Sequence, residues 1–171
     1  MEKYIPDIYQ KSIYSINYDK LRKRGIKCIL FDLDNTLVPI TVKDVDDELK
    51  NLIYKLKDMG MKTIIFSNSS SKRVEQFKQA LEIEGYSYTF KPFAKKINDI
   101  LKIYKEDEIA IIGDQMITDV ALGNKIGITT ILVNPISKND KLLTKFNRKK
   151  EKHIMTKLRN NNLFVKGRYY E

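Results

Sequence analysis

Residues 28–37 read Cys-Ile-Leu-Phe-Asp-Leu-Asp-Asn-Thr-Leu, and this stretch decides the fold. Its apolar first half, within an expected strand at Ile26–Phe31, is typical of a strand buried on both faces of a parallel sheet. Two carboxylates, Asp32 and Asp34, come directly after it. Because ligands bind at the carboxyl ends of the strands in such sheets, these side chains mark the edge where a site is expected.

Short apolar runs alternate with helical patterns along the rest of the chain, as parallel βαβ units require. Further strands are expected at Thr63–Phe66, Tyr86–Phe90, Ile109–Ile112 and Thr129–Val133. A last helix packed on the body is indicated by Leu142, Leu143, Phe146, Ile154 and Leu158. The pattern predicts an α/β fold with a doubly wound, Rossmann-like, mostly parallel sheet of five strands.

The composition excludes several classes of protein. The chain has 171 residues, which suits a single domain, and one cysteine, Cys28, so a disulfide framework is excluded. A second histidine besides His153 is lacking, which argues against a His-rich zinc or iron site. The apolar runs are too short to span a bilayer, and Glu2, Lys3 and Asp7 stand where a signal peptide needs apolar residues. We therefore expect a cytoplasmic protein, with residues 1–171 forming one domain.

The net charge of +10 is concentrated near the C-terminus. Residues 138–171 hold 11 Lys or Arg against 3 Asp or Glu, whereas the remainder is nearly neutral. Such a basic segment suits an anionic membrane surface, a nucleic acid or an acidic substrate, and it also suits a solvated tail without a partner. The segment lacks an evident base-stacking pattern, which makes nucleic acid the less favoured partner.

The N-terminal segment, residues 1–24, is aromatic and basic. It alternates Tyr4, Tyr9, Tyr14 and Tyr18 with isoleucines and ends in the basic run 20–24. Two interpretations stay open: these side chains pack against the body, or they form a patch at a membrane surface, where Tyr and Lys or Arg are favoured.

Polar residues also follow three other expected strands. Ser67 and Asn68 follow the second strand, Lys91 the third, and Asp114 and Asp119 the fourth. Each has a simpler explanation: Ser67, Asn68 and Asp119 as helix caps, Lys91 as a surface lysine. Because all of them meet at one edge of the sheet with Asp32 and Asp34, an active site is the better interpretation.

Four carboxylates with one lysine and one serine suit Mg²⁺ and a phosphate. Asp32, the first side chain after its strand, is placed to attack phosphorus, and Asp34 to move a proton to and from the reacting oxygens. Ser67 and the amide of Asn68 are expected to hold phosphate oxygens, with Lys91 as a cationic clamp. Asp114 is expected to hold the metal with Asp32, assisted by Asp119.

The residues resemble the motifs of the haloacid dehalogenase phosphatase superfamily. Phe31 to Leu37 resembles motif one, Ser67 after its strand resembles motif two, Lys91-Pro92 resembles the lysine motif of subfamily IIIA, and Gly113 to Asp119 resembles motif four. The resemblance implies an aspartyl-phosphate on Asp32 and a metal ligand in the backbone carbonyl of Asp34.

A closer similarity is to the bacterial YqeG-type group, which is similar to mitochondrial phosphatidylglycerophosphate phosphatases. It is carried by Ile5-Pro6-Asp7, Gly25-Ile26-Lys27, Asp34 to Leu37, the Gly-Asp-Gln…Thr-Asp run, Gly123-Asn124 and Asn147-Arg148…Glu151. The resemblance implies removal of the terminal phosphate of phosphatidylglycerophosphate to give phosphatidylglycerol, a step of phospholipid biosynthesis. With the basic C-terminal segment, which suits anionic lipid, we expect peripheral contact at the inner face of the membrane.

The spacing between the motifs leaves no room for a cap domain. Only 32 residues separate Asp34 from Ser67, and 23 separate Ser67 from Lys91, which a helix and a strand fill in each case. An open site admits a phosphate on a large body, so the alternatives to a lipid are a nucleic-acid end or a phosphoprotein. A non-catalytic binding protein on the same scaffold is the remaining alternative.

Overall fold

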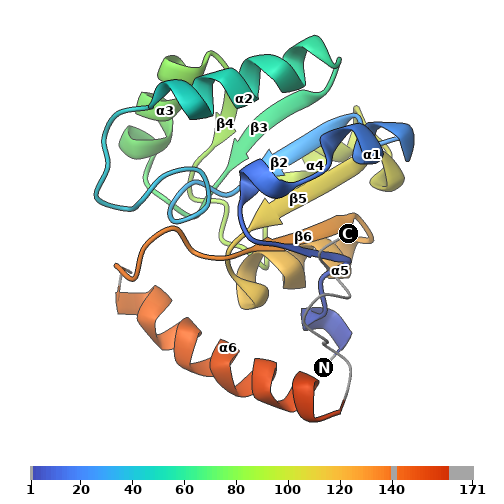
Figure 1. Cartoon of the computed structure of the whole chain (residues 1–171), viewed down its shortest axis with the longest axis vertical. Coiled ribbons are helices and arrows are strands. Elements are labelled where there is room, and N and C mark those ends of the chain that lie inside the picture. The colour runs from blue at the N-terminus through green and yellow to red at the C-terminus, as the bar shows by residue number, and fades with distance from the viewer. Residues whose placement is uncertain (1, 140–141, 162–171) are drawn as a thin grey trace.

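The computed structural model describes residues 2–139 and 142–161, so that residues 140, 141 and 162–171 of the basic segment lie outside the described part. The fold is built on a fully parallel sheet with helices on both faces, as Figure 1 shows. The strands are β1 (Ile8–Gln10), β2 (Cys28–Phe31), β3 (Lys62–Phe66), β4 (Glu84–Tyr86), β5 (Ile109–Gly113) and β6 (Thr129–Val133). The helices are α1 (Tyr18–Lys23), α2 (Asp47–Asp58), α3 (Ser71–Leu81), α4 (Ile97–Leu101), α5 (Ala121–Ile126) and α6 (Leu142–Asn160).

The predicted doubly wound sheet is confirmed, but the expected number of five strands is wrong. The described sheet has six strands in the order β1-β6-β5-β2-β3-β4. The strand that the sequence pattern missed is β1, which pairs in parallel with β6 at one edge. It is only three residues long and its buried ends are Ile8 and Gln10, so it shows neither an apolar run nor an apolar alternation.

The opposite edge of the sheet also differs from the expected strand at Tyr86–Phe90. Strand β4 ends at Tyr86, because the backbone enters the left-handed region at Tyr88 (φ 46°) and Phe90 (φ 57°), which lies outside regular strand geometry. Residues 87–96 therefore form a loop that leads from the sheet edge to α4.

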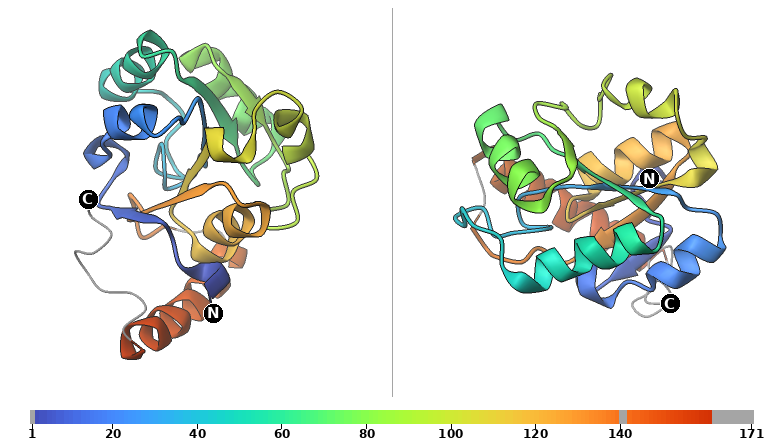
Figure 2. Two further views of the ribbon diagram at one scale, coloured as in Figure 1. Left: turned by 90° about the vertical axis from the view of Figure 1, so that its right-hand side faces the viewer. Right: turned by 90° about the horizontal axis from the view of Figure 1, so that it is seen from above.

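Apolar side chains on the two faces of the sheet form the core. On one face, β2 and β3 pack against α2 and α3, whose buried residues include Leu49, Ile53 and Phe77. On the other face, α4 and α5 cover the sheet (Figure 2). Ile97 of α4 and Leu122 of α5 pack there against buried residues of β2, β3 and β5. Cys28 is fully buried in this second layer, as expected for a core thiol.

The N-terminal aromatic segment packs against the body. Ile13 and Ile16 join the core, and Tyr18 is buried with its hydroxyl group donating to the carbonyl oxygen of Ile13 at 2.8 Å. Tyr14 is the exposed tyrosine of the set, at 41%. Of the two interpretations of this segment, the structure therefore supports packing, since most of the apolar groups that a membrane patch needs are inside.

Helix α6 lies along the end of the molecule next to the N-terminal segment (Figure 1). It buries Leu158 against Met116, Val120 and Leu132, which confirms that a helix after Pro135 packs on the body. Phe146, in contrast, is 57% exposed, and His153 is exposed as expected. Among the described helices, none combines the length and the apolar character that crossing a membrane requires.

Candidate active site

The carboxyl ends of four neighbouring strands bring the expected site residues together. Asp32 follows β2, Ser67 follows β3 and Asp114 follows β5, while Lys91 comes from the loop after β4. The chain folds this way because β2, the most central of these strands, pairs on both sides and is apolar throughout. The first polar side chains after each strand therefore meet at one edge.

Lys91 lies between two carboxylates in the interior. Its Nζ atom donates to Asp32 Oδ1 at 2.7 Å and to Asp119 Oδ1 at 2.6 Å. The lysine side chain is 1% exposed. Burial by itself lowers the pKa of this ammonium group, but the charges of Asp119 and Asp32 raise it above its ordinary value. Lys91 is therefore a fixed positive charge and not a surface lysine.

Three carboxylates share the site. Asp32, Asp114 and Asp119 are all buried, and one oxygen atom from each lies within 4.8 Å of the others. Burial, opposed by Lys91 and reinforced by Asp119, raises the pKa of Asp32 to about 6. Burial and the neighbouring Asp32 and Asp119 likewise raise the pKa of Asp114 to about 8, against the charge of Arg148. The cluster is therefore short of positive charge.

This donor set fits a hard divalent cation. Three carboxylates face two cationic side chains, Lys91 and Arg148, so their full ionisation leaves a negative charge in a buried place. Carboxylate oxygen atoms are the ligands that Mg²⁺ prefers, together with phosphate oxygens and water. The residues present are thus those that a metal-dependent phosphate site requires.

Asp119 reaches the cluster from a π-helical turn, Met116–Val120, which follows β5. Turns of this kind are frequent at functional sites. The carboxylate Oδ2 of Asp119 accepts from the backbone N–H of Gln115 at 3.2 Å and from the Thr118 hydroxyl at 3.3 Å. A Cβ atom at Gly113 would lie 2.2 Å from Asp119 Cγ, so only glycine leaves room for this carboxylate. Asp119 is held in the site and is not a simple helix cap.

Asp34 lines the same cavity but has its own partners. Its carboxylate accepts a hydrogen bond from the Ser69 hydroxyl and one from Arg73 Nε at 2.5 Å. Arg73 also donates to the carbonyl oxygens of Val42 (2.8 Å) and Pro39 (3.2 Å), which ties the loop after β2 to α3. Sequence reasoning missed Arg73, because nothing in the helical pattern of α3 distinguishes an arginine that points to the site.

Ser67 and Asn68 differ in what their side chains do. Ser67 Oγ accepts from the backbone N–H of Ser69 at 3.2 Å and lines the cavity. Asn68 Oδ1 accepts from the backbone N–H of Lys91 (2.8 Å) and from the Thr89 hydroxyl (2.9 Å). The Asn68 side chain thus holds the loop that carries Lys91.

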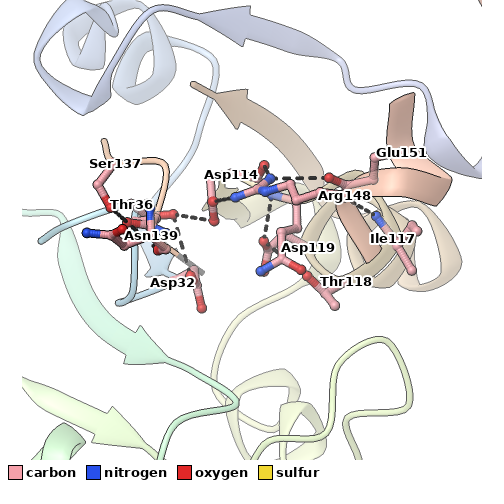
Figure 3. A network of polar contacts seen from close by, with 12 residues as sticks. Asp32, Thr36, Asp114, Ile117, Thr118, Asp119, Ser137, Asn139, Arg148 and Glu151 are labelled. Atoms are coloured by element: carbon pink, nitrogen blue, oxygen red, sulfur yellow. Dashed lines mark hydrogen bonds and ion pairs between the residues drawn. The ribbon is translucent and has the colours of Figure 1, made fainter. Parts of the chain in front are cut away.

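Two residues of α6 reach the cluster, and Figure 3 shows them beside Asp114. Arg148 donates to the carboxylate of Asp114 and, through Nη1, to its carbonyl oxygen at 2.7 Å. Glu151 accepts from Arg148 at 3.2 Å and from the backbone N–H of Ile117 at 3.1 Å. Thr36 Oγ1 donates to Asp114 Oδ1 at 3.1 Å from the other side. In the sequence, the only indication of this contact is the motif Asn147-Arg148…Glu151 in the family resemblance. Arg148 and Asp114 are too far apart in sequence for a local pattern to predict that they meet.

The site opens into a cavity of about 140 Å³. It is lined by the loop after β2, the loop after β3, Lys91, the π-helical turn and α6, whose contributions are Thr144 and Asn147. The segments that follow β2 and β3 within the described residues are loops, 32–46 and 67–70, with no inserted domain. The arrangement presents a buried carboxylate and a lysine at the bottom of a small open cavity, which suits attack on a phosphate group.

Comparison with known proteins agrees with this chemistry. Residues 1–137 match the family described as Mitochondrial PGP phosphatase. "Probable phosphatase YqeG" of Bacillus subtilis (strain 168) is 36% identical over 158 residues, covering 91% of this chain and 92% of that protein. "Phosphatidylglycerophosphate phosphatase 1, chloroplastic/mitochondrial" of Arabidopsis thaliana is 25% identical over 145 residues, covering 78% of this chain and 42% of the plant protein.

A solved structure shares the fold. The cobalt-bound deoxy-D-mannose-octulosonate 8-phosphate phosphatase of Haemophilus influenzae superposes with a TM-score of 0.51 at 18% identity, over 68% of this chain and 81% of that one. Together with the strand order and the family match, this likeness agrees with the similarity seen in the motifs. The chain therefore belongs to the Mitochondrial PGP phosphatase family and is a phosphatase with the haloacid dehalogenase fold.

Proposed function

We propose that this protein is a Mg²⁺-dependent phosphomonoester hydrolase that converts phosphatidylglycerophosphate to phosphatidylglycerol through an aspartyl-phosphate. One observation carries the chemistry: the buried carboxylate of Asp32 lies 2.7 Å from Lys91 Nζ and within reach of Asp114 and Asp119, at the bottom of the cavity. The substrate rests on the relatives, since the family model and the Arabidopsis protein carry this lipid in their descriptions.

In the first step, an oxygen of Asp32 attacks phosphorus and the bond from phosphorus to the ester oxygen breaks. Asp34, which lines the same cavity, enters this step as the protonated carboxylic acid and gives its proton to the leaving oxygen, becoming a carboxylate. Lys91 offsets the repulsion between the nucleophile and the phosphate. The product of this step is a phosphate on Asp32 and a free glycerol hydroxyl group.

In the second step, water attacks the phosphorus of the aspartyl-phosphate and Asp34 takes the proton that water loses. The bond between phosphorus and the Asp32 oxygen breaks, which restores the carboxylate and releases inorganic phosphate. Arg73 and Ser69 keep the Asp34 carboxylate in place for both transfers. Ser67 and the backbone N–H of Asn68 hold phosphate oxygens.

Asp32, Asp114, Asp119 and the backbone carbonyl of Asp34 would hold Mg²⁺. The metal supplies the positive charge that the carboxylate cluster lacks and attracts the phosphate oxygens. We further propose that the whole chain, residues 1–171, acts as one domain without a cap at the cytoplasmic side of a membrane. The exposed lysines of α6 face an anionic surface in this proposal: Lys145, Lys149, Lys150 and Lys152.

The function is tested with purified protein and phosphatidylglycerophosphate in mixed micelles. We expect release of inorganic phosphate with Mg²⁺, loss of that release with EDTA, and recovery when Mg²⁺ is restored. Mg²⁺ should also raise the melting temperature, because a cation that binds the folded state offsets the crowded carboxylates. Preference for phosphorylated oligonucleotides or phosphopeptides over the lipid would reject the substrate, and turnover in EDTA would reject the metal.

Arg148 is proposed as a positioning residue for Asp114. Replacing Arg148 by alanine removes the contacts with the carboxylate and the carbonyl oxygen of Asp114, so that carboxylate loses its fixed orientation. We expect about a 10-fold rise in the Mg²⁺ concentration for half-maximal activity, as for other residues that orient metal ligands. Lysine at position 148 should recover only part of the loss, because it lacks the forked donor geometry of arginine.

The matched control for Arg148 is Arg159→Ala, which removes an exposed arginine from the same helix. It should leave the Mg²⁺ dependence unchanged. If Arg148→Ala and Arg159→Ala have the same Mg²⁺ dependence as the wild type, the positioning role of Arg148 is wrong.

A further inference from the structure

Three aromatic side chains stand exposed in the loop that carries Lys91. Tyr88 is 46% exposed, Phe90 70% and Phe93 75%. We refer to residues 88–93 as the aromatic loop. Large apolar side chains with this much exposure gain nothing from the folded core, and a cluster of them beside a site marks an interaction surface.

The aromatic loop alternates exposed rings with groups of the site. Thr89 and Lys91 point inward, where they are buried and contact Asn68 and Asp32. The backbone N–H of Tyr88 donates to Ser69 O at 2.9 Å, and that of Thr89 donates to Ser67 O at 3.1 Å. The hydrogen bonds that fix Lys91 in the site therefore also fix the neighbouring rings on the outside.

The exposed rings form a group. Tyr88 and Phe90 stack with their centroids 6.4 Å apart. The backbone N–H of Phe93 donates to Phe90 O at 2.9 Å, so a tight turn keeps the two phenylalanines close. Both Tyr88 and Phe90 hold left-handed backbone angles, which are unfavourable for bulky residues. The structure thus maintains an exposed aromatic cluster in spite of backbone strain.

The charge around the aromatic loop is positive. Between Gly85 and Asn98 the sequence has no acidic residue. Lys95 is exposed there and Lys96 is half-buried, whereas Lys91 is buried in the site and adds no charge to the surface. Lys125 of α5 adds a cation 5.3 Å from the centroid of Phe93. Aromatic rings interleaved with lysine are characteristic of segments that lie at the headgroup level of a membrane.

The other side of the cavity repeats this combination. Thr144 and Asn147 of α6 line the cavity, while Phe146 between them is 57% exposed. The Nζ atom of Lys150 lies 4.6 Å from the centroid of Phe146. Exposed aromatic and basic side chains therefore lie on two elements that also line the cavity and are distant in sequence.

We propose that the aromatic loop and Phe146 insert into the headgroup region of an anionic phospholipid bilayer and thereby hold the cavity against the membrane. The occupant follows from charge complementarity, since the rings are accompanied by lysines and by no acidic residue in the loop. The proposal deepens the proposed function, because a lipid phosphate can reach Asp32 only if the cavity faces the bilayer. Vesicle binding itself does not depend on turnover.

The test is sedimentation of the full chain with vesicles of phosphatidylcholine, with and without phosphatidylglycerol. We expect the wild type to bind the anionic vesicles. Phe90→Ser combined with Phe93→Ser should weaken that binding at least about 10-fold, because the inserted apolar area is lost. Hydrolysis of p-nitrophenyl phosphate should stay unchanged, since neither Phe90 nor Phe93 lines the cavity.

The matched control is Ile103→Ser. Ile103 is 74% exposed and follows α4 before β5 begins, so it lies away from the edge that carries the site. This variant should bind vesicles as the wild type does. Equal vesicle binding by the double variant and the wild type would overturn the proposal. The proposal would also be overturned if the wild type were a dimer in analytical ultracentrifugation and the double variant a monomer, because a second copy of the chain would then cover the rings.

The outcomes separate this proposal from the proposed function. A wild type that binds vesicles through the aromatic loop but leaves phosphatidylglycerophosphate intact would reject the substrate and keep the membrane contact. If the wild type hydrolyses the lipid in micelles and the double variant binds vesicles as well as the wild type does, the membrane contact is rejected and the substrate is kept.

Discussion

Asp32→Asn is expected to abolish phosphate release from every phosphomonoester that the wild type hydrolyses. The amide of asparagine cannot form the bond to phosphorus. Direct attack of water on the phosphate ester is the reaction that remains, and it is far slower. Loss of an essential nucleophile costs at least about 10³-fold in turnover. Acid-quenched protein exposed to labelled substrate should retain phosphate in the wild type and none in Asp32→Asn. Retention of a tenth of the wild-type rate would contradict the nucleophilic role.

The melting temperature of Asp32→Asn shows whether the loss of activity comes from unfolding. Burial and Asp119 together outweigh Lys91 and raise the pKa of Asp32, so the folded state disfavours the charged carboxylate. A neutral side chain of the same shape should therefore melt no lower than the wild type when metal is absent. Asp44→Asn, in the same loop but exposed, should keep full activity.

Lys91→Met is expected to lower turnover by about 10²–10³-fold and also to destabilise the fold. The substitution keeps an unbranched side chain that replaces the methylene groups of lysine, but it removes the ammonium group that contacts both Asp32 and Asp119. Two buried carboxylates then lose their partner, which costs several kcal/mol, about 3–5 for a broken buried pair. Chemical denaturation and initial rates measure the two effects separately.

Mg²⁺ should restore part of the stability of Lys91→Met but little of its rate. The metal offsets the carboxylates, whereas the repulsion between Asp32 and the incoming phosphate also needs the lysine. Lys57→Met, which removes an exposed lysine of α2, should change neither quantity. A stability and a rate equal to those of the wild type would show that Lys91 is not the clamp.

The sequence predicts the centre of this molecule well because local signals determine it. The apolar run of β2 can only be a buried strand, and the polar residues after it, after β3 and after β5 then share an edge. The sequence predicts Lys91 for the site, although it predicts the preceding strand at Tyr86–Phe90 and the structure has it at Glu84–Tyr86. The position of Lys91 depends less on that strand than on the loop that carries it and on the carboxylates of Asp32 and Asp119, to which it donates.

The parts that sequence reasoning missed depend on contacts between distant segments. Strand β1 forms because it pairs with the edge of β6. Its own three residues, one of them a glutamine, carry no pattern that predicts a strand. Arg148 reaches Asp114 only because Leu158 anchors α6 against the π-helical turn. The left-handed backbone at Tyr88 likewise follows from its hydrogen bond to Ser69 O, which no propensity encodes.

Gly113 gives a different view of what counts as part of a catalytic centre. It has no side chain to take part in the reaction, yet the carboxylate of Asp119 occupies the space that a side chain at position 113 would need. Even a single methyl group there would displace that carboxylate from Lys91 and from the other two acids. The reactive geometry therefore depends on unfilled volume as much as on functional groups. The absence of a side chain at position 113 is as necessary to the site as the carboxylate of Asp119.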